Sequence, residues 1–325
     1  MKVLYGIQLT GNGHITRSIK IITALKSVGF DVDIITSGTN SQLKLPFEIK
    51  KQFQGLSFFY NKKGGIDWIK TLLSLKLKQF LSDLKYDVSS YDLIISDFEP
   101  VSAWSSRRSN KKSLGIGNQY SFRSNKTPRP FFKDIFSEIF IKFFAPCKEH
   151  IGINYKKYDK FITLPIISDD FINRKVADKK FYLVYLPSMS SKFISEQINS
   201  YGTGNWKVYS PDVLKDSSDG IVKLKKLDKE KFSKDLLDCS GVITASGFST
   251  TSEALVLGKK LWSIPIKGQY EQLCNAKALK KMSVFTDNLN NDNIFEWIYN
   301  YKSIKYDWND PIEDIVKKIS DYAKS

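Results

Sequence analysis

The chain has 325 residues, a length that predicts two domains of ordinary size, and 42% of its residues are hydrophobic, enough for packed cores. No apolar run approaches the roughly 18 residues of a membrane-spanning helix, and Lys2 leads directly into a predicted strand, so we expect neither a spanning helix nor a signal peptide. The formal charge of +16 favours an anionic partner, which could be nucleic acid, an anionic membrane face or a sugar nucleotide. Three cysteines without metal-ligand spacing favour a reducing cytoplasm.

Short apolar strands alternate with helical patterns along the whole chain, which predicts an α/β protein with parallel sheets. We expect a first Rossmann-like domain over residues 1–170 and a second over 171–325, with a polar linker at 169–180. In the first half, strands are predicted at 3–9, 32–35, 92–96, 113–117 and 161–165, with short strands and turns in 39–60 and helices at about 15–28 and 66–84. In the second half, strands are predicted at 181–186, 206–209, 221–224, 242–245 and 261–264, and helices at 192–199, 229–237 and 311–323.

The loop after the first strand reads Gly11-Asn12-Gly13-His14 and begins like a dinucleotide-binding fingerprint. The third glycine position, however, holds Thr16, and the second strand ends in Thr36-Ser37 where an acidic residue would bind the ribose of a nicotinamide cofactor. We therefore predict a nucleotide-binding fold that holds no nicotinamide dinucleotide.

The most informative stretch runs from residue 241 to residue 281. A buried strand at 242–245 is interrupted by Ser246-Gly247, and the hydroxyl residues 249–252 are predicted to cap the next helix, with Glu253 in its first turn. A strand that leads through small residues into a helix N-terminus presents free backbone N–H groups and the positive end of the helix dipole. The pattern therefore predicts an anion-binding site. An ordinary strand, turn and capped helix is the competing interpretation.

The polar positions of this stretch resemble the donor-binding signature of GT-B glycosyltransferases, and the chain is similar to the lipid-II-forming N-acetylglucosaminyltransferases and to a bacterial and archaeal glycosyltransferase-like group. The resemblance rests on Ser-Gly-Phe-Ser-Thr-Thr-Ser-Glu-Ala at 246–254, Gly-Lys at 258–259, Ile-Pro at 264–265 and Gly-Gln-Tyr-Glu-Gln at 268–272. It implies a GT-B fold with two Rossmann-like domains and an interdomain cleft, in which the last helix crosses back to the first domain. It also implies that Glu253 holds the nucleotide ribose, that the turn 246–250 holds the diphosphate, and that Glu271 and Gln272 hold the donor sugar. The donor site predicted in this way comprises Gly13, Arg17, Ser188, Ser246, Gly247, Phe248, Ser249, Thr250, Glu253, Gln269, Glu271 and Gln272.

Sugar transfer needs a base for the acceptor hydroxyl, and His14 is the candidate because it follows the first strand at the edge where open α/β sheets bind ligands. Asp97 ends another strand at the same edge and would orient the ring, although it could instead cap the helix that begins near Glu99-Pro100. Asp97 and Glu99 are the alternative bases. A histidine that merely caps a turn is the competing interpretation of His14. Asn12, Asn118 and Gln119 are the predicted acceptor-binding residues.

We expect neither a cofactor nor a metal ion to be required. The Asp31-Val32-Asp33 pair starts a strand at the wrong end of the sheet to hold a sugar nucleotide. Helix dipoles and backbone N–H groups can replace a divalent ion at a diphosphate.

Residues 131–148 combine six phenylalanines with Lys133, Lys142 and Lys148. A helix buried on the first domain is the favoured interpretation, and a surface that contacts lipid is the alternative.

Together with the resemblance, the sequence predicts a metal-independent, inverting enzyme that transfers a sugar from a UDP-sugar to a lipid-linked or cell-envelope glycan. We expect it to contact the inner face of an anionic cytoplasmic membrane peripherally. Three other interpretations remain: a sugar-nucleotide epimerase or hydrolase, a binding-only relative without transferase activity, and a basic nucleic-acid-binding protein. The last is disfavoured because no recognition motif appears. The oligomeric state is left open.

Overall fold

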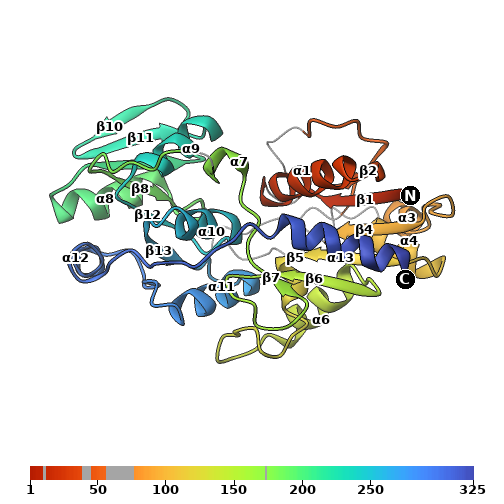
Figure 1. Cartoon of the computed structure of the whole chain (residues 1–325). Coiled ribbons are helices and arrows are strands. Elements are labelled where there is room, and N and C mark those ends of the chain that lie inside the picture. The colour runs from red at the N-terminus through yellow and green to blue at the C-terminus, as the bar shows by residue number, and fades with distance from the viewer. Residues whose placement is uncertain (10–11, 39–44, 56–76, 173) are drawn as a thin grey trace.

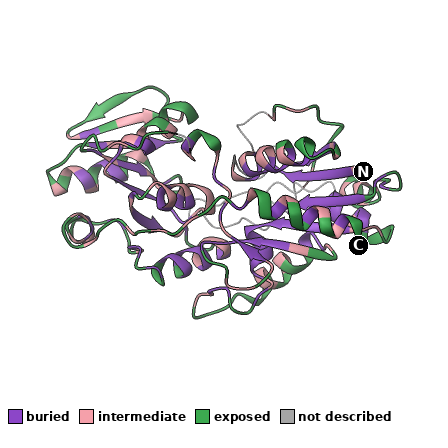
Figure 2. Cartoon of the chain, viewed as in Figure 1, coloured by how far each residue is buried: buried purple, intermediate pink, exposed green. Residues whose placement is uncertain are grey.

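The computed structural model describes residues 1–9, 12–38, 45–55, 77–172 and 174–325. These residues form two α/β halves, each built on a largely parallel sheet with helices packed on it (Figure 1). The central strands of the two sheets are the most completely buried parts of both halves (Figure 2). A buried parallel sheet reads as near-continuous apolar runs, and this is why its strands were recognisable in the sequence.

The first sheet has seven parallel strands in the order β3-β2-β1-β4-β5-β6-β7. Its strands are β1 (Lys2–Gln8), β2 (Asp31–Ser37), β3 (Lys51–Phe53), β4 (Leu93–Asp97), β5 (Ser113–Gly117), β6 (Glu149–Ile153) and β7 (Ile162–Thr163). Its helices are α1 (Asn12–Ser27), α3 (Leu77–Asp83), α4 (Pro100–Arg108), α5 (Asn118–Ser121) and α6 (Ile135–Phe144), and α7 (Asp169–Ile172) lies in the connection to the second half.

The strand order of the first sheet reverses direction between β1 and β4, which are direct neighbours. Ile7 on β1 pairs with Asp97 on β4, so the chain that leaves β1 toward α1 passes the carboxyl end of β4. Open α/β sheets bind their ligands at such a switch point, because the loops on its two sides turn in opposite directions and leave a crevice.

The second sheet repeats this plan in the order β10-β11-β9-β8-β12-β13, with only β10 antiparallel, and its switch point lies between β8 and β12. Its strands are β8 (Tyr182–Tyr185), β9 (Trp206–Ser210), β10 (Ser217–Asp219), β11 (Val222–Lys226), β12 (Gly241–Ala245) and β13 (Lys260–Ile264). Its helices are α8 (Ser191–Tyr201), α9 (Lys229–Asp238), α10 (Phe248–Val256), α11 (Tyr270–Lys280) and α12 (Asn291–Asn300).

The C-terminal segment returns to the first half, where α13 (Ile312–Lys324) lies beside α1 (Figure 1). Ile315 and Ile319 are fully buried in the core that β1, β2, β4 and α1 form. On the way, the indole of Trp308 donates a hydrogen bond to the Pro165 carbonyl, and Lys20 on α1 forms an ion pair with Asp310. The return segment therefore fastens the connection between the halves to the first half.

Several expectations about individual elements need correction. The first helix begins at Asn12, three residues earlier than expected, and β6 and α12 had no sequence prediction. The expected capping of α10 by the hydroxyls of 249–252 is wrong. The helix starts at Phe248 after Gly247, no side chain caps it, and Glu253 lies beyond its first turn. Of the expected helix 66–84, residues 66–76 lie outside the described part of the chain, as do 39–44 and 56–60 of the region expected to hold short strands.

The expectation that the aromatic segment forms a buried helix is also wrong. Helix α6 is exposed over much of its surface, with Phe136 84% exposed and Phe143 51% exposed (Figure 2). Phe131 and Phe132, just before the helix, are similarly exposed, and only Phe144 of the helix is buried. Helical spacing of apolar residues identifies an apolar face, but it does not say whether protein covers that face.

Candidate active site

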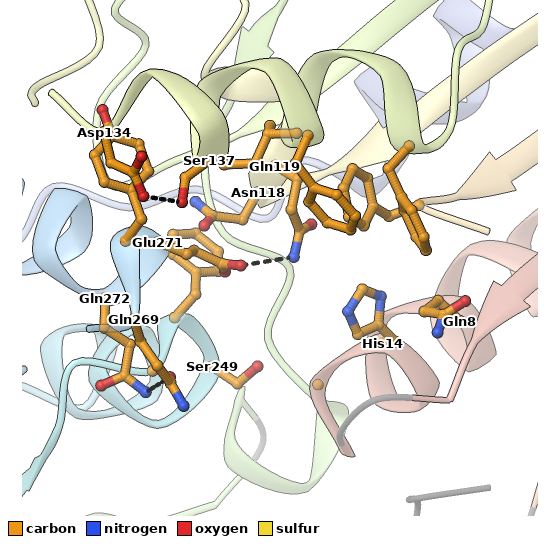
Figure 3. Close-up of a pocket in the computed structure, with 18 of the residues that line it drawn as sticks. Gln8, His14, Asn118, Gln119, Asp134, Ser137, Ser249, Gln269, Glu271 and Gln272 are labelled. Atoms are coloured by element: carbon orange, nitrogen blue, oxygen red, sulfur yellow. Dashed lines mark hydrogen bonds between the residues drawn. The ribbon is translucent and has the colours of Figure 1, made fainter. Parts of the chain in front are cut away.

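A cavity of about 350 Å³ lies between the two halves, at the carboxyl ends of both sheets. Figure 3 shows His14 and Gln8 on one side, Glu271, Gln272 and Gln269 on another, and Asn118 and Gln119 between them. Helix α6 supplies a further wall with Phe140, Ile141 and Phe144. The cavity therefore joins a polar end with titratable groups to an apolar end.

His14 and Asp97 form a buried pair in this cavity, as the two switch-point loops predict. The Nδ1 atom of His14 lies 2.7 Å from Oδ1 of Asp97, and the exposed fractions of the two residues are 8% and 0%. Burial alone would raise the pKa of Asp97, but the charge of Arg17 and the hydrogen bonds from Arg17 and His14 hold it below its usual range. Asp97 is thus an ionised carboxylate that can orient the ring and leave Nε2 for a substrate.

Arg17, which the sequence placed among the donor-binding residues, lines the cavity and is paired with Asp97. Its Nε donates to Oδ2 of Asp97 at 2.7 Å, and its Nη2 donates to Oδ1. The hydroxyl of Ser18 also donates to Oδ2, at 3.0 Å. Because Arg17 is one helical turn beyond His14, both side chains reach the end of β4 from the same face of α1.

Glu99, the third expected catalytic residue, is the N-cap of α4 and does not line the cavity. Its carboxylate accepts hydrogen bonds from the backbone N–H groups of Val101 and Ser102 at 2.7 and 2.6 Å, and from the hydroxyl of Ser37 at 2.5 Å. The capping role that the sequence also allowed for Asp97 therefore belongs to Glu99. Asp97 therefore does not cap α4, and its carboxylate can pair with His14.

The N-terminus of α10 opens onto the cavity through Gly247, Phe248 and Ser249. Because Gly247 offers no side chain to cap the helix, the first N–H groups of α10 keep their hydrogen-bonding capacity. Gly13 approaches Ser249 so closely that a side chain at position 13 would collide with it. Ser246 lies behind this turn, fully buried, with its hydroxyl 2.7 Å from that of Ser263. Ser246 therefore shapes the turn and does not line the cavity.

Helix α11 begins at the same cavity, also without a side-chain cap. Glu271 accepts a hydrogen bond from the amide of Gln119 at 3.0 Å, a contact between the two halves. Burial raises the pKa of Glu271, and the positive charge of Arg17 and the Gln119 bond act in the opposite direction. Gln272 is held by the backbone N–H of Ile266 and by Gln269. Asn118 and Gln119 each bury a side-chain carbonyl oxygen that has no hydrogen-bond partner in the described structure, so both retain capacity for a ligand.

A smaller cavity of about 150 Å³ adjoins the first, since Gly13 and Ser249 line both. Thr250 and Glu253 line it together with the rings of Tyr185 and Phe232, which meet edge to face at 5.5 Å. Burial raises the pKa of Glu253 to about 7, although the charge of Lys229 acts against this. A carboxyl group beside two aromatic rings is chemistry that suits a nucleoside.

Four predicted site residues line neither cavity: Asp97, Glu99 and Ser246, which are described above, and Ser188, which is exposed after β8. Asn12 begins α1, but its side chain lies outside the described part of the chain. Sequence reasoning missed Gln8, Phe98, Tyr185 and Phe232. Gln8 ends β1 at the same edge of the sheet where Asp97 ends β4, so the argument that identified Asp97 could also have identified Gln8. The local sequence of Phe232, in contrast, has no feature that indicates a role in the site.

In the described residues, no group of three or more His, Cys, Asp or Glu side chains is arranged to hold a metal ion. Likewise, no helix in the described ranges is long and apolar enough to cross a membrane.

Two parallel-sheet domains with a ligand cleft between their switch points define the GT-B class, and solved structures of that class match the whole chain. The MurG of Acinetobacter baumannii aligns with a TM-score of 0.58 at 12% identity, covering 99% of this chain and 100% of that one. Arabidopsis thaliana UGT89C1, crystallised with UDP, gives 0.57 at 12% identity, covering 99% and 94%. A putative UDP-N-acetylglucosamine 2-epimerase from Listeria monocytogenes gives 0.65 at 10% identity, covering 99% and 96%.

These likenesses establish the fold. The family follows from the sequence: residues 1–301 match the family described as Glycosyl transferase family 1, and the chain belongs to it. The protein is therefore a glycosyltransferase. A comparison with curated protein sequences gives no match.

Proposed function

We propose that the enzyme transfers a sugar from a UDP-sugar to a hydroxyl group of a lipid-linked or cell-envelope glycan, with inversion and without a metal ion. The observation that carries this proposal is the composition of one cavity. It holds the His14–Asp97 pair, the uncapped N-terminus of α10 and an apolar wall from α6. A base, an anion site and a surface for an amphiphile are what such a transfer requires.

The reaction that fits this arrangement is a single displacement. Nε2 of His14 accepts the proton of the acceptor hydroxyl, whose oxygen bonds to the anomeric carbon as the bond to the diphosphate oxygen breaks. The N–H groups at the start of α10 stabilise the charge that develops on the diphosphate. The base and the helix N-terminus belong to opposite halves, which supports attack and departure on opposite faces of the sugar and therefore the proposed inversion.

The donor would lie across both cavities. Its nucleoside occupies the smaller one, where the carboxylate of Glu253 accepts hydrogen bonds from the ribose hydroxyls and the rings of Tyr185 and Phe232 flank the base. Its diphosphate follows at Ser249, and Glu271 with Gln272 holds the sugar in the larger cavity. Helix N-termini at the diphosphate favour activity without a divalent ion, and full activity in the presence of EDTA tests that part.

The acceptor side of the proposal rests on α6. One part of this helix lines the cavity with Phe140 and Phe144, while Phe136 and Phe143 face solvent. Lys133 and Lys142 are exposed on the same segment, and the whole chain carries +16. Apolar rings with neighbouring lysines suit an anionic membrane surface, where each lysine contributes about 1 kcal/mol. We infer that α6 rests on the inner face of the cytoplasmic membrane and that an amphiphilic acceptor enters the cavity along it.

The test is transfer of radiolabelled sugar from UDP-glucose and UDP-N-acetylglucosamine to a bacterial membrane lipid extract. The proposal requires label in the organic phase and release of UDP that depends on the extract. Release of UDP without any acceptor would indicate a hydrolase, and conversion of the UDP-sugar to its epimer would indicate an epimerase. Either result would refute the proposed transfer.

A further inference from the structure

We propose that Arg17 is a positioning residue that keeps His14 in its neutral, proton-accepting form by supplying the positive charge that the buried carboxylate of Asp97 requires. The inference rests on the proposed role of His14 as the base. It assigns to Arg17 a task that is separate from donor binding.

The first step of the argument is the burial of Asp97. Its side chain is fully buried, and a buried carboxylate is stable only if it is paired with a positive charge and hydrogen-bonded. Two side chains in contact with it can carry that charge, Arg17 and His14. The guanidinium of Arg17 contacts both carboxylate oxygens, whereas His14 contacts one.

The second step is the distance between the two candidates. Nη2 of Arg17 lies 2.7 Å from Nδ1 of His14, and the exposed fraction of the arginine side chain is only 8%. A guanidinium stays protonated under all ordinary conditions, so a protonated imidazole would place a second positive charge directly beside the first. With Arg17 in place, the negative charge of Asp97 is already balanced, so protonation of the His14 ring is stabilised only slightly.

Titratable groups on neighbouring elements also face the pair. Tyr5 on β1 has its pKa raised by burial and stays neutral, and burial raises the pKa of Glu271 on α11, which favours the uncharged form of this carboxyl group. Helix α5 contributes the neutral amides of Asn118 and Gln119. Asp134, at the start of α6, lines the cavity farther from the ring, and its carboxylate accepts a hydrogen bond from Ser137 (Figure 3).

Without Arg17, the imidazole would be the only cation in direct contact with Asp97 within the described residues. The ring would then take up a proton and form an ion pair with the carboxylate. A doubly protonated imidazole has no lone pair for the acceptor hydroxyl, so the base would be lost although His14 and Asp97 were both intact.

The protonation state of His14 can be observed without any substrate, because the chain has only two histidines. In the full chain labelled with ¹⁵N-histidine, a long-range ¹H–¹⁵N spectrum at pH 7.5 distinguishes a ring with one bare nitrogen from a ring with two protonated nitrogens. The variant His14→Gln assigns the signals. His150 is an internal reference, since burial lowers its pKa to about 4 and keeps it neutral.

We expect wild type and Arg17→Lys, which retains the charge, to show one bare nitrogen on His14, and Arg17→Met to show two protonated nitrogens. A doubly protonated His14 in wild type, or a neutral one in folded Arg17→Met, would overturn the proposal. If Arg17→Met does not fold, the double variant Arg17→Met/Asp97→Asn removes both charges. It must then show a neutral ring, and a protonated one overturns the proposal.

Binding and turnover separate this role from a structural one and from contact with the diphosphate. Calorimetry with UDP should show an affinity within about threefold of wild type for Arg17→Met, and a loss above about tenfold would place the guanidinium on the diphosphate and refute the proposal. Turnover of Arg17→Met should recover as the pH rises, whereas that of His14→Gln should not. If no acceptor supports turnover in wild type, the proposed transfer fails while the spectra still decide the role of Arg17.

Discussion

At the scale of single residues, the site depends on three acids that have different tasks. Asp97 is ionised and orients His14, Glu99 caps α4, and Glu253 faces the smaller cavity with a pKa of about 7. Their local sequences do not separate these tasks, because Asp97 and Glu99 are two residues apart. The hydrogen bonds that each acid accepts decide its role.

The role of His14 as base gives the first prediction. His14→Ala should lower turnover by about a hundredfold to ten-thousandfold, because proton transfer in the transition state is lost while the donor contacts remain. Steady-state kinetics and calorimetry with UDP measure the two effects separately. Retained turnover would move the base to another group, and a parallel loss of UDP affinity would indicate a structural defect.

The raised pKa of Glu253 gives a prediction about pH. Hydroxyl donors of a ribose bind the ionised carboxylate better than the neutral acid, and Glu253 loses its proton as the pH rises through about 7. Uridine, which has no phosphate, should therefore bind more tightly at pH 8 than at pH 6. Glu253→Gln should weaken binding at pH 8 by about tenfold and remove the pH dependence. Calorimetry with uridine checks both, and a pH dependence that persists in the variant would exclude this carboxyl group as its source.

At the scale of elements, α6 is the helix whose surroundings the sequence did not reveal. Its exposed and buried faces provide a matched pair of variants. Phe136→Asp replaces a ring that is 84% exposed, so the melting temperature should stay near that of wild type while flotation with anionic vesicles is lost. Neutral vesicles should bind wild type weakly, and salt should release part of it from anionic ones.

The buried counterpart is Phe144→Asp, which places a charge in the cluster formed with Phe98 and Tyr120 and should unfold the protein or lower its melting temperature strongly. Thermal unfolding followed by circular dichroism distinguishes the two variants. If Phe136→Asp unfolds as well, or if wild type does not bind anionic vesicles, the membrane proposal fails.

The elements also show what the sequence could and could not predict. The carboxyl ends of β1 and β4 could be placed side by side, because parallel strands present those ends at one edge, and this was enough to pair His14 with Asp97. The pairing of Arg17 with Asp97 could not be predicted, since an exposed arginine in the first turns of a helix has the same local sequence pattern. The start of α10 was misplaced because Ser and Thr are frequent N-caps, whereas the fold uses Gly247 and leaves the N–H groups of the turn open.

At the scale of the whole molecule, α13 completes the core of the first half although it follows the second half in the sequence. Removing residues 312–325 would expose the core that Ile315 and Ile319 complete. Loss of each buried isoleucine costs about 2–5 kcal/mol, and a domain has only about 5–15 kcal/mol in total. We expect the truncated chain to be unfolded in its first half. Denaturation in urea of Ile315→Ala, compared with the exposed Lys317→Ala, tests this at single positions, and equal midpoints for the two variants would refute it.

Because α13 completes the core of the first half, the ribosome synthesises that half as two stretches of chain that are separated by the second half. Residues 1–172 leave the exit tunnel first, but the helix that covers α1 and its sheet is synthesised only after the entire second half. The first half must wait with apolar surface uncovered, and the second half can fold before it. During synthesis, the second half would then fold before the first half, although it follows it in the chain. Chaperone binding to nascent chains stalled at increasing lengths would measure when the apolar surface of the first half becomes covered.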